Sequence, residues 1–236
     1  MDRLRVLNRN QIKYIAIIAM VIDHIAWSFV PLNSVPGVVL HFIGRLTGPI
    51  MGFFLAEAYL HTRSVPKLAL RLGIFAVISW IPYSLFETGK WPSEQIGVMY
   101  TLFLGLIAIW IWDKAKCEDW IKLLIFIGIV LLSQFGDWAI SDVLWPFFMV
   151  IYKDDKIRKW YWFGGVCVYS IVNSFISMGV YKGIAQFGII VAALILMFMY
   201  NGERGSGHPF HKWFFYVFYP LHLFVLAIIR YDMIRL

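Results

Sequence analysis

Residues 11–30 read QIKYIAIIAMVIDHIAWSFV, an apolar run that carries Asp23 and His24 near its middle. The run has roughly the 20 residues that a helix needs to cross a bilayer. A charged side chain at bilayer depth costs roughly 2.5 kcal/mol or more, so such groups usually face an internal cavity and carry function. Arg45 and His222 interrupt two further apolar runs in the same way. The pattern predicts a transmembrane helix bundle around a buried polar site.

The composition supports this class of protein. The chain has 236 residues, of which 61% are hydrophobic and 15% are charged, and its mean hydropathy is +0.72. A soluble domain of this length needs more polar surface. We therefore expect an all-α, polytopic membrane helix bundle that forms a single integral-membrane domain over residues 1–236. The first run has no A-x-A site and is followed by more apolar runs, so we expect it to be retained as a span. Cys117 and Cys167 suggest neither a disulfide framework nor a metal site.

The apolar runs and the basic residues between them predict the topology. Nine spans are expected, at 12–30, 37–59, 67–86, 96–112, 120–135, 138–152, 160–177, 183–200 and 213–230. With the N-terminus inside, 16 Lys and Arg residues fall in inner segments and 4 in outer ones, namely Lys90, Lys182, Arg230 and Arg235. This excess obeys the positive-inside rule and places the C-terminus outside. It accounts for the net charge of +7 without a nucleic-acid partner.

The fifth and sixth spans are the shortest of the nine and are separated by only Gly136 and Asp137. The polar run that begins at Ser133 suits a turn that lines a cavity, so one or both spans can be short or re-entrant. Asp137 places a carboxylate near the outer face. We include it among the candidate catalytic residues.

Lys13 and His24 lie 11 positions apart, so they share one face of the first helix at a separation of roughly 16 Å. Lys13 is expected at the inner mouth and His24 near the centre of the membrane. A neutral imidazole is well suited to accept a proton near neutral pH. The alternative is a packing histidine with a lysine that extends to the interface. His222 follows Tyr219-Pro220 in the last span and is expected at a similar depth.

Arg45 needs a carboxylate or carbonyl partner at its expected depth. It can form a structural salt bridge with Asp23 or contribute an electrostatic role at the site. Asp23 can also orient a neighbouring histidine. Around Arg45, small residues recur every four positions, at Gly44, Gly48, Gly52 and Ala56. This spacing indicates close helix packing.

Two inner segments are candidates for binding an anion. Glu57 and His61 lie four positions apart on one helical face and precede Arg63, a pattern that fits either a surface cap or an anion-binding rim. The loop of residues 201–208 is rich in glycine, and its Asn201, Gly202 and Arg204 can approach a phosphate. It is not a P-loop, because no Gly-Lys-Ser/Thr follows. A plain flexible loop is the alternative. No grouping has the spacing of metal ligands.

The order and spacing of these motifs resemble the TraX family over essentially the whole chain. The resemblance is carried by Ile15-Ala16-x3-Met20-x2-Asp23-His24-Ile25, Gly44-Arg45-Leu46-x2-Pro49-Ile50, Ala56-Glu57-x2-Leu60-His61-Thr62-Arg63, Arg71-Leu72, Ser79-x-Ile81-Pro82, Tyr200-Asn201-Gly202-x-Arg204-Gly205 and Tyr216-x2-Tyr219-Pro220-x-His222-Leu223. The segment Gly136-Asp137-Trp138-Ala139 departs from the family pattern at Ala139, where a glycine is expected. Lys13-x10-His24 also resembles the Arg/Lys-x10-His signature of acyltransferase family 3.

The resemblance implies a multi-pass acetyltransferase of the bacterial plasma membrane. Its donor is acetyl-CoA, and its acceptor is an amine or hydroxyl of a pilin-like protein or another envelope component. The implied donor site contains Lys13, Glu57, His61, Arg63, Asn201, Gly202 and Arg204. The implied catalytic residues are His24 as general base or acyl acceptor, Asp23 as its support, Arg45 at the oxyanion, and His222 and Asp137.

Two other functions remain open from the residues alone. A proton-coupled secondary transporter of a small anionic solute can use the same buried Asp, His and Arg. The inverted repeats that favour transport are not found. An assembly protein without catalysis leaves the polar groups in the membrane unexplained.

Overall fold

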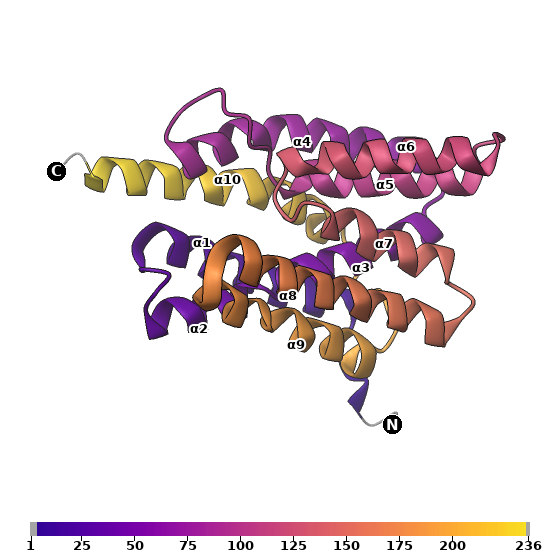
Figure 1. The fold of residues 1–236 in the computed structure, drawn as a ribbon, viewed down its shortest axis with the longest axis horizontal. Coiled ribbons are helices and arrows are strands. Elements are labelled where there is room, and N and C mark those ends of the chain that lie inside the picture. Colours follow the sequence, from indigo (N-terminus) through magenta and orange to yellow (C-terminus); the bar gives the residue numbers. More distant parts are fainter. Residues whose placement is uncertain (1–3, 235–236) are drawn as a thin grey trace. The chain divides into compact units, whose positions relative to one another are not determined.

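The computed structural model describes residues 4–234, and these form helices joined by short loops (Figure 1). Arg235, which the topology prediction counts in an outer segment, lies outside these residues. The helices are α1 (Arg9–Phe29), α2 (Val35–Gly44), α3 (Thr47–His61), α4 (Val65–Thr88), α5 (Val98–Lys114), α6 (Asp119–Leu132), α7 (Ser141–Ile151), α8 (Lys156–Gln186), α9 (Gly188–Leu194) and α10 (Pro209–Ile234). Ser133–Phe135 is a 3₁₀ turn, η2, and Ile195–Met199 is a π-helical turn, η3. No β-strand occurs in the described range, which confirms the all-α prediction.

Five of the described helical segments are long and apolar enough to cross a membrane. They are Arg9–Phe29, Val35–His61, Val65–Thr88, Lys156–Gln186 and Pro209–Tyr231. Ser141–Ile151 and Gly188–Met199 are shorter apolar segments. The chain therefore has the character of a helical membrane protein. The nine-span count and its orientation stay predictions.

The predicted span 37–59 is interrupted in its middle. Helix α2 ends at Gly44, and α3 begins at Thr47 after a turn at Arg45 and Leu46. Arg45 therefore lies at the end of α2 and not in the middle of one continuous helix. The predicted fifth and sixth spans become α6 and α7, which have 14 and 11 residues and are joined by η2 and a turn.

The described residues divide into two compact units. Among them, unit 1 comprises residues 4–51 and 167–234, and unit 2 comprises Gly52–Val166. Within unit 1, α1 packs against α2 and α10, and α2 packs against α9. Within unit 2, α5 packs against α4, α6 and α7. The prediction of a single domain over residues 1–236 stays a prediction.

Helices α1 and α10 run parallel, which sets the frame of unit 1. The hydroxyl of Tyr14 lies 2.7 Å from Nδ1 of His211, and Nδ1 of His24 lies 2.9 Å from Nε2 of His222. The partners advance together along both helices, so both helices start at the same end. Helix α1 is started there by a capping box between Asn8 and Gln11.

Helix α8 contains a reversal at Gly179, whose φ of 82° favours glycine. The Nε2 amide of Gln186 donates to Oγ of Ser170 over 2.8 Å, and the Phe175 and Phe187 rings are 6.3 Å apart. Residues on either side of Gly179 therefore pack as an antiparallel helical hairpin. Lys182 lies just after this reversal, and its side chain is buried within unit 1. Its placement in an outer segment stays a prediction.

Candidate functional site

Two histidines at the α1–α10 contact form a buried pair. His24 and His222 are 7% and 8% exposed, and their Nδ1 and Nε2 atoms lie 2.9 Å apart. Nδ1 of His222 lies 2.9 Å from the carbonyl oxygen of Phe218. The two side chains that the sequence places at similar depth are thus in direct contact.

The backbone carbonyl fixes the tautomers of this pair when both rings are neutral. A carbonyl oxygen only accepts, so Nδ1 of His222 carries the proton and its Nε2 is an acceptor. Nδ1 of His24 must then donate to that Nε2 atom. The lone pair of His24 is left on Nε2. This arrangement prepares His24 to accept a proton or to attack a carbonyl carbon.

A second polar cluster lies between α1 and α2. Oδ1 of Asp23 accepts a hydrogen bond from Nδ1 of His41 over 2.8 Å, and Oδ2 pairs with Nη2 of Arg45. All three side chains are buried. The pairing of Asp23 with Arg45 is the salt bridge that the sequence allows. Asp23 was expected to support His24, but the structure directs its carboxylate to His41 and Arg45.

Gly44 makes the cluster possible because it leaves room for the carboxylate. A Cβ atom on Gly44 would overlap the side chain of Asp23. Among the small residues that recur in this segment, Gly44 therefore has a local role. It allows the backbone of α2 to lie against the side chain of Asp23 in α1.

His41, Lys182 and Trp27 are parts of this cluster that the sequence analysis missed. His41 is fully buried, and its ring lies 4.7 Å from the Trp27 ring. Nζ of Lys182 lies 3.9 Å from the centre of the Trp27 ring, within the range of a cation–π contact. One signal for His41 was available in the sequence. It precedes Arg45 by four positions and therefore shares its helical face.

The N-terminal ends of α1 and α10 lie side by side. We call residues 7–14 and 199–215, which make up this region, the mouth. The backbone of Leu7 bonds with Met199 (2.9 Å) and Asn201 (3.0 Å), and the Arg9 N–H donates to the Glu203 carbonyl (2.8 Å). The loop with Asn201, Gly202 and Arg204 is thereby fixed beside the first turn of α1.

The mouth offers cationic groups to an anion. Nζ of Lys13 lies 4.7 Å from the centre of the Phe215 ring, and the side chain of Arg204 is exposed. Lys212 lies on the first turn of α10 and is also exposed. Such residues carry the positive charge with which proteins bind phosphate and other anions. Lys13 and Lys212 lie on the same two helices as the His24–His222 pair, and Arg204 lies in the loop before α10.

The other predicted site residues belong to unit 2. Glu57 and His61 lie in the second half of α3, and Arg63 is exposed in the loop that follows. Asp137 lies in the turn before α7, where its Oδ1 accepts a hydrogen bond from the Trp138 N–H over 2.9 Å. The roles assigned to these four residues stay predictions.

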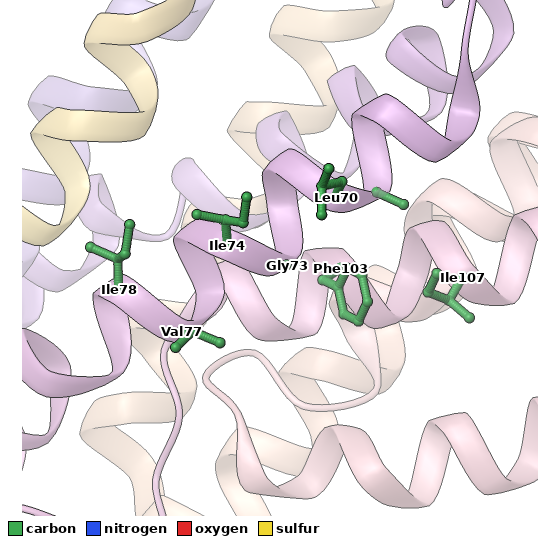
Figure 2. Close-up of a pocket in the computed structure, with 8 residues that line it drawn as sticks. Leu70, Gly73, Ile74, Val77, Ile78, Phe103 and Ile107 are labelled. Carbon is green, nitrogen blue, oxygen red and sulfur yellow. The ribbon is translucent and has the colours of Figure 1, made fainter.

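Unit 2 also contains an apolar groove of about 600 Å³ between α4 and α5 (Figure 2). It is lined by Ala69, Leu70, Gly73, Ile74, Val77, Ile78, Phe103 and Ile107. None of these side chains can transfer a proton or bind a phosphate, so the groove suits hydrocarbon rather than chemistry. Within residues 4–234, no group of three or more His, Cys, Asp or Glu side chains is arranged to hold a metal ion.

Comparison with known proteins relates the chain to one family. The family model described as TraX protein matches residues 8–230. The probable fimbrial assembly protein FimC, serogroup H1, of Dichelobacter nodosus is 29% identical over 230 residues, which cover 92% of this chain and 93% of that protein. No solved structure matches the chain.

Proposed function

The chain belongs to the TraX family, and on that premise we propose that it is a membrane-bound acetyltransferase. It takes the acetyl group from acetyl-CoA at the inner face of the bacterial plasma membrane. The acceptor is an amine or hydroxyl of an envelope component. The description of the relative as a probable fimbrial assembly protein favours the N-terminal amine of a pilin-like subunit.

The observation that carries the proposal is the His24–His222 pair, with its lone pair on Nε2 of His24. Acetyl transfer needs a group that accepts a proton or the acetyl group itself, and this nitrogen can do either. His222 orients His24 and can receive its Nδ1 proton when Nε2 forms a new bond.

The remaining parts of unit 1 support the same reaction. The mouth lies at one end of α1 and α10, and Lys13, Arg204 and Lys212 hold the phosphates of the donor there. The acetyl end can then extend along the parallel helices toward His24. Arg45 is held by Asp23 and provides positive charge within the buried cluster, where it can stabilise an oxyanion.

The test uses purified protein in proteoliposomes with acetyl-CoA on the side of the mouth. The probe acceptor is a synthetic peptide with a free N-terminal amine, and the same peptide with a blocked N-terminus is its control. We expect coenzyme A thiol to appear with the free peptide only, in step with acetylated peptide. Uptake of a solute without loss of thioester supports the transporter instead. Release of coenzyme A thiol at the same rate with either peptide contradicts an amine acceptor.

A further inference from the structure

His41 carries an unusual buried nitrogen. Its side chain is fully buried, and its Nδ1 donates to Oδ1 of Asp23 because a carboxylate only accepts. The lone pair of the neutral ring is therefore on Nε2. Among the described atoms, this Nε2 has no hydrogen-bond partner. Unpaired buried polar atoms are costly and rare, so this one requires an explanation.

The surroundings fix His41 more firmly than a packing role requires. Asp23 is held from its other oxygen by Arg45 and is fitted against the backbone of Gly44. A carboxylate in this position selects the tautomer of the imidazole and stabilises the imidazolium that forms when Nε2 takes a proton. The Trp27 ring covers one part of His41 and excludes water from it.

The His24–His222 pair and the Asp23–His41 pair are separate hydrogen-bond systems. His24 is oriented by a histidine and, through it, a carbonyl, whereas His41 is oriented by a carboxylate. Each system leaves one Nε2 lone pair. Unit 1 therefore has two basic nitrogens, one on α1 and one on α2. An acyl transfer requires two steps of this kind, because a group must act on the acetyl group and a base must remove the proton of the acceptor.

We propose that His41 is the catalytic base that removes the proton from the acceptor, while His24 and His222 act on the acetyl group. This inference rests on the proposed acetyltransferase function. The acceptor nitrogen or oxygen forms a bond to the acetyl carbonyl carbon. The bond from that carbon to its leaving group, the sulfur of coenzyme A or Nε2 of an acetylated His24, breaks with the electron pair.

The acceptor proton goes to Nε2 of His41 and is later released to solvent. The coenzyme A thiolate takes up one proton, so the products are an acetylated acceptor and a free thiol. Asp23 stays ionised throughout and balances the imidazolium. The class of acceptor follows from this chemistry. It is a group that must lose a proton on acylation and that must come within hydrogen-bond distance of Nε2 of His41.

The test relies on His41→Asn. The Asn amide can still donate to Asp23 in place of Nδ1, but it has no atom at the position of Nε2, so it separates proton removal from positioning. We expect kcat with the free-amine peptide to fall about 100-fold or more. Affinity for acetyl-CoA should stay unchanged, because the donor phosphates bind at the mouth. Val39→Ala changes an exposed residue of the same helix and serves as the control, with wild-type turnover expected.

A second variant tests the role of the missing base directly. In His41→Ala, added imidazole should raise turnover at least tenfold, whereas the His24→Ala and wild-type proteins should show no such gain. Lack of rescue in a folded variant, with thermal unfolding unchanged, assigns His41 a positioning role and overturns the inference. So does more than a tenth of wild-type kcat in His41→Asn. If wild-type protein never consumes acetyl-CoA, the proposed function itself fails.

Discussion

Nδ1 of His24 and Nε2 of His222 lie 2.9 Å apart although 198 residues separate them along the chain. Tyr14 and His211, which are in contact near the N-terminal ends of the same two helices, are separated by nearly the same number of residues, 197. The contact therefore reflects the parallel packing of α1 and α10 and not an isolated side-chain approach. Both histidines acquire their orientation from it, which gives the first prediction.

His24→Ala should abolish acetyl transfer while the protein stays folded. The substitution removes the nitrogen that the proposed function assigns to the acetyl group, and an acid–base group contributes about 100-fold or more. Turnover is measured as coenzyme A thiol released in the presence of the free-amine peptide. Retention of more than about a tenth of wild-type turnover is inconsistent with the assignment.

Arg45→Met should destabilise the protein strongly, because it leaves the Asp23 carboxylate buried without its charged partner. Breaking a buried ion pair from one side costs about 3–5 kcal/mol. In the double variant Asp23→Asn, Arg45→Met, much of this loss should be recovered, since no charge is left unpaired. Thermal unfolding in detergent measures both. If the loss of stability in the double variant equals the sum of the losses in Asp23→Asn and Arg45→Met, the two side chains are not directly coupled.

Gly44→Ala should destabilise by about 1–3 kcal/mol, because the added methyl group overlaps Asp23 and overpacking has costs of this size. The matched control is Gly164→Ala, where a Cβ meets nothing within 4 Å. That change is expected to be neutral or stabilising by up to about 1 kcal/mol, since alanine favours a helix. Equal effects of the two substitutions contradict the close approach of α2 to Asp23.

Arg204→Ala and Lys13→Ala should each weaken coenzyme A binding by about 1 kcal/mol or more if the residue pairs with a phosphate. The loss should be larger at low salt, because exposed charges are screened as ionic strength rises. Titration calorimetry measures the affinity, and Lys156→Ala, an exposed residue of unit 2, is the control. Unchanged affinity in both test variants moves the donor site away from the mouth.

The predicted topology can be tested with an impermeant thiol reagent. Nine spans with the N-terminus inside place Cys117 inside and residue 235 outside. Cys117 should react only from the inner face, and a cysteine at position 235, in a chain with Cys117→Ser, only from the outer face. Labelling of both positions from one face shows that a span is miscounted, with residues 120–152 the first place to look.

The sequence identified Asp23, His24, Arg45 and His222 because each interrupts an otherwise apolar run, and such interruptions are costly in lipid. The parallel contact of α1 with α10 was accessible in outline, since both histidines were expected at one depth. The TraX resemblance is confirmed by the family match over residues 8–230. These features depend on local composition and on motif order.

The sequence did not predict the contacts of the buried polar residues with His41 and Lys182, because these contacts form only when the helices pack together. His41 lies near the start of its apolar run, so its depth and its bond to Asp23 emerge only when α2 packs on α1. Lys182 lies just after the reversal at Gly179 and reads as part of a loop. The side chain of Lys182 is buried against Trp27 because the hairpin packs Lys182 within unit 1.

The parallel contact of α1 with α10 also sets when the His24–His222 pair can form during synthesis of the chain. A ribosome that adds about 5–20 residues per second needs roughly 10–40 s to cover the 198 residues between His24 and His222. During that interval α1 is already made but lacks its partner histidine. A nascent or prematurely terminated chain that ends before α10 therefore contains the helix with His24 but not its histidine partner. Under the proposed function, only a chain that includes α10 is expected to react.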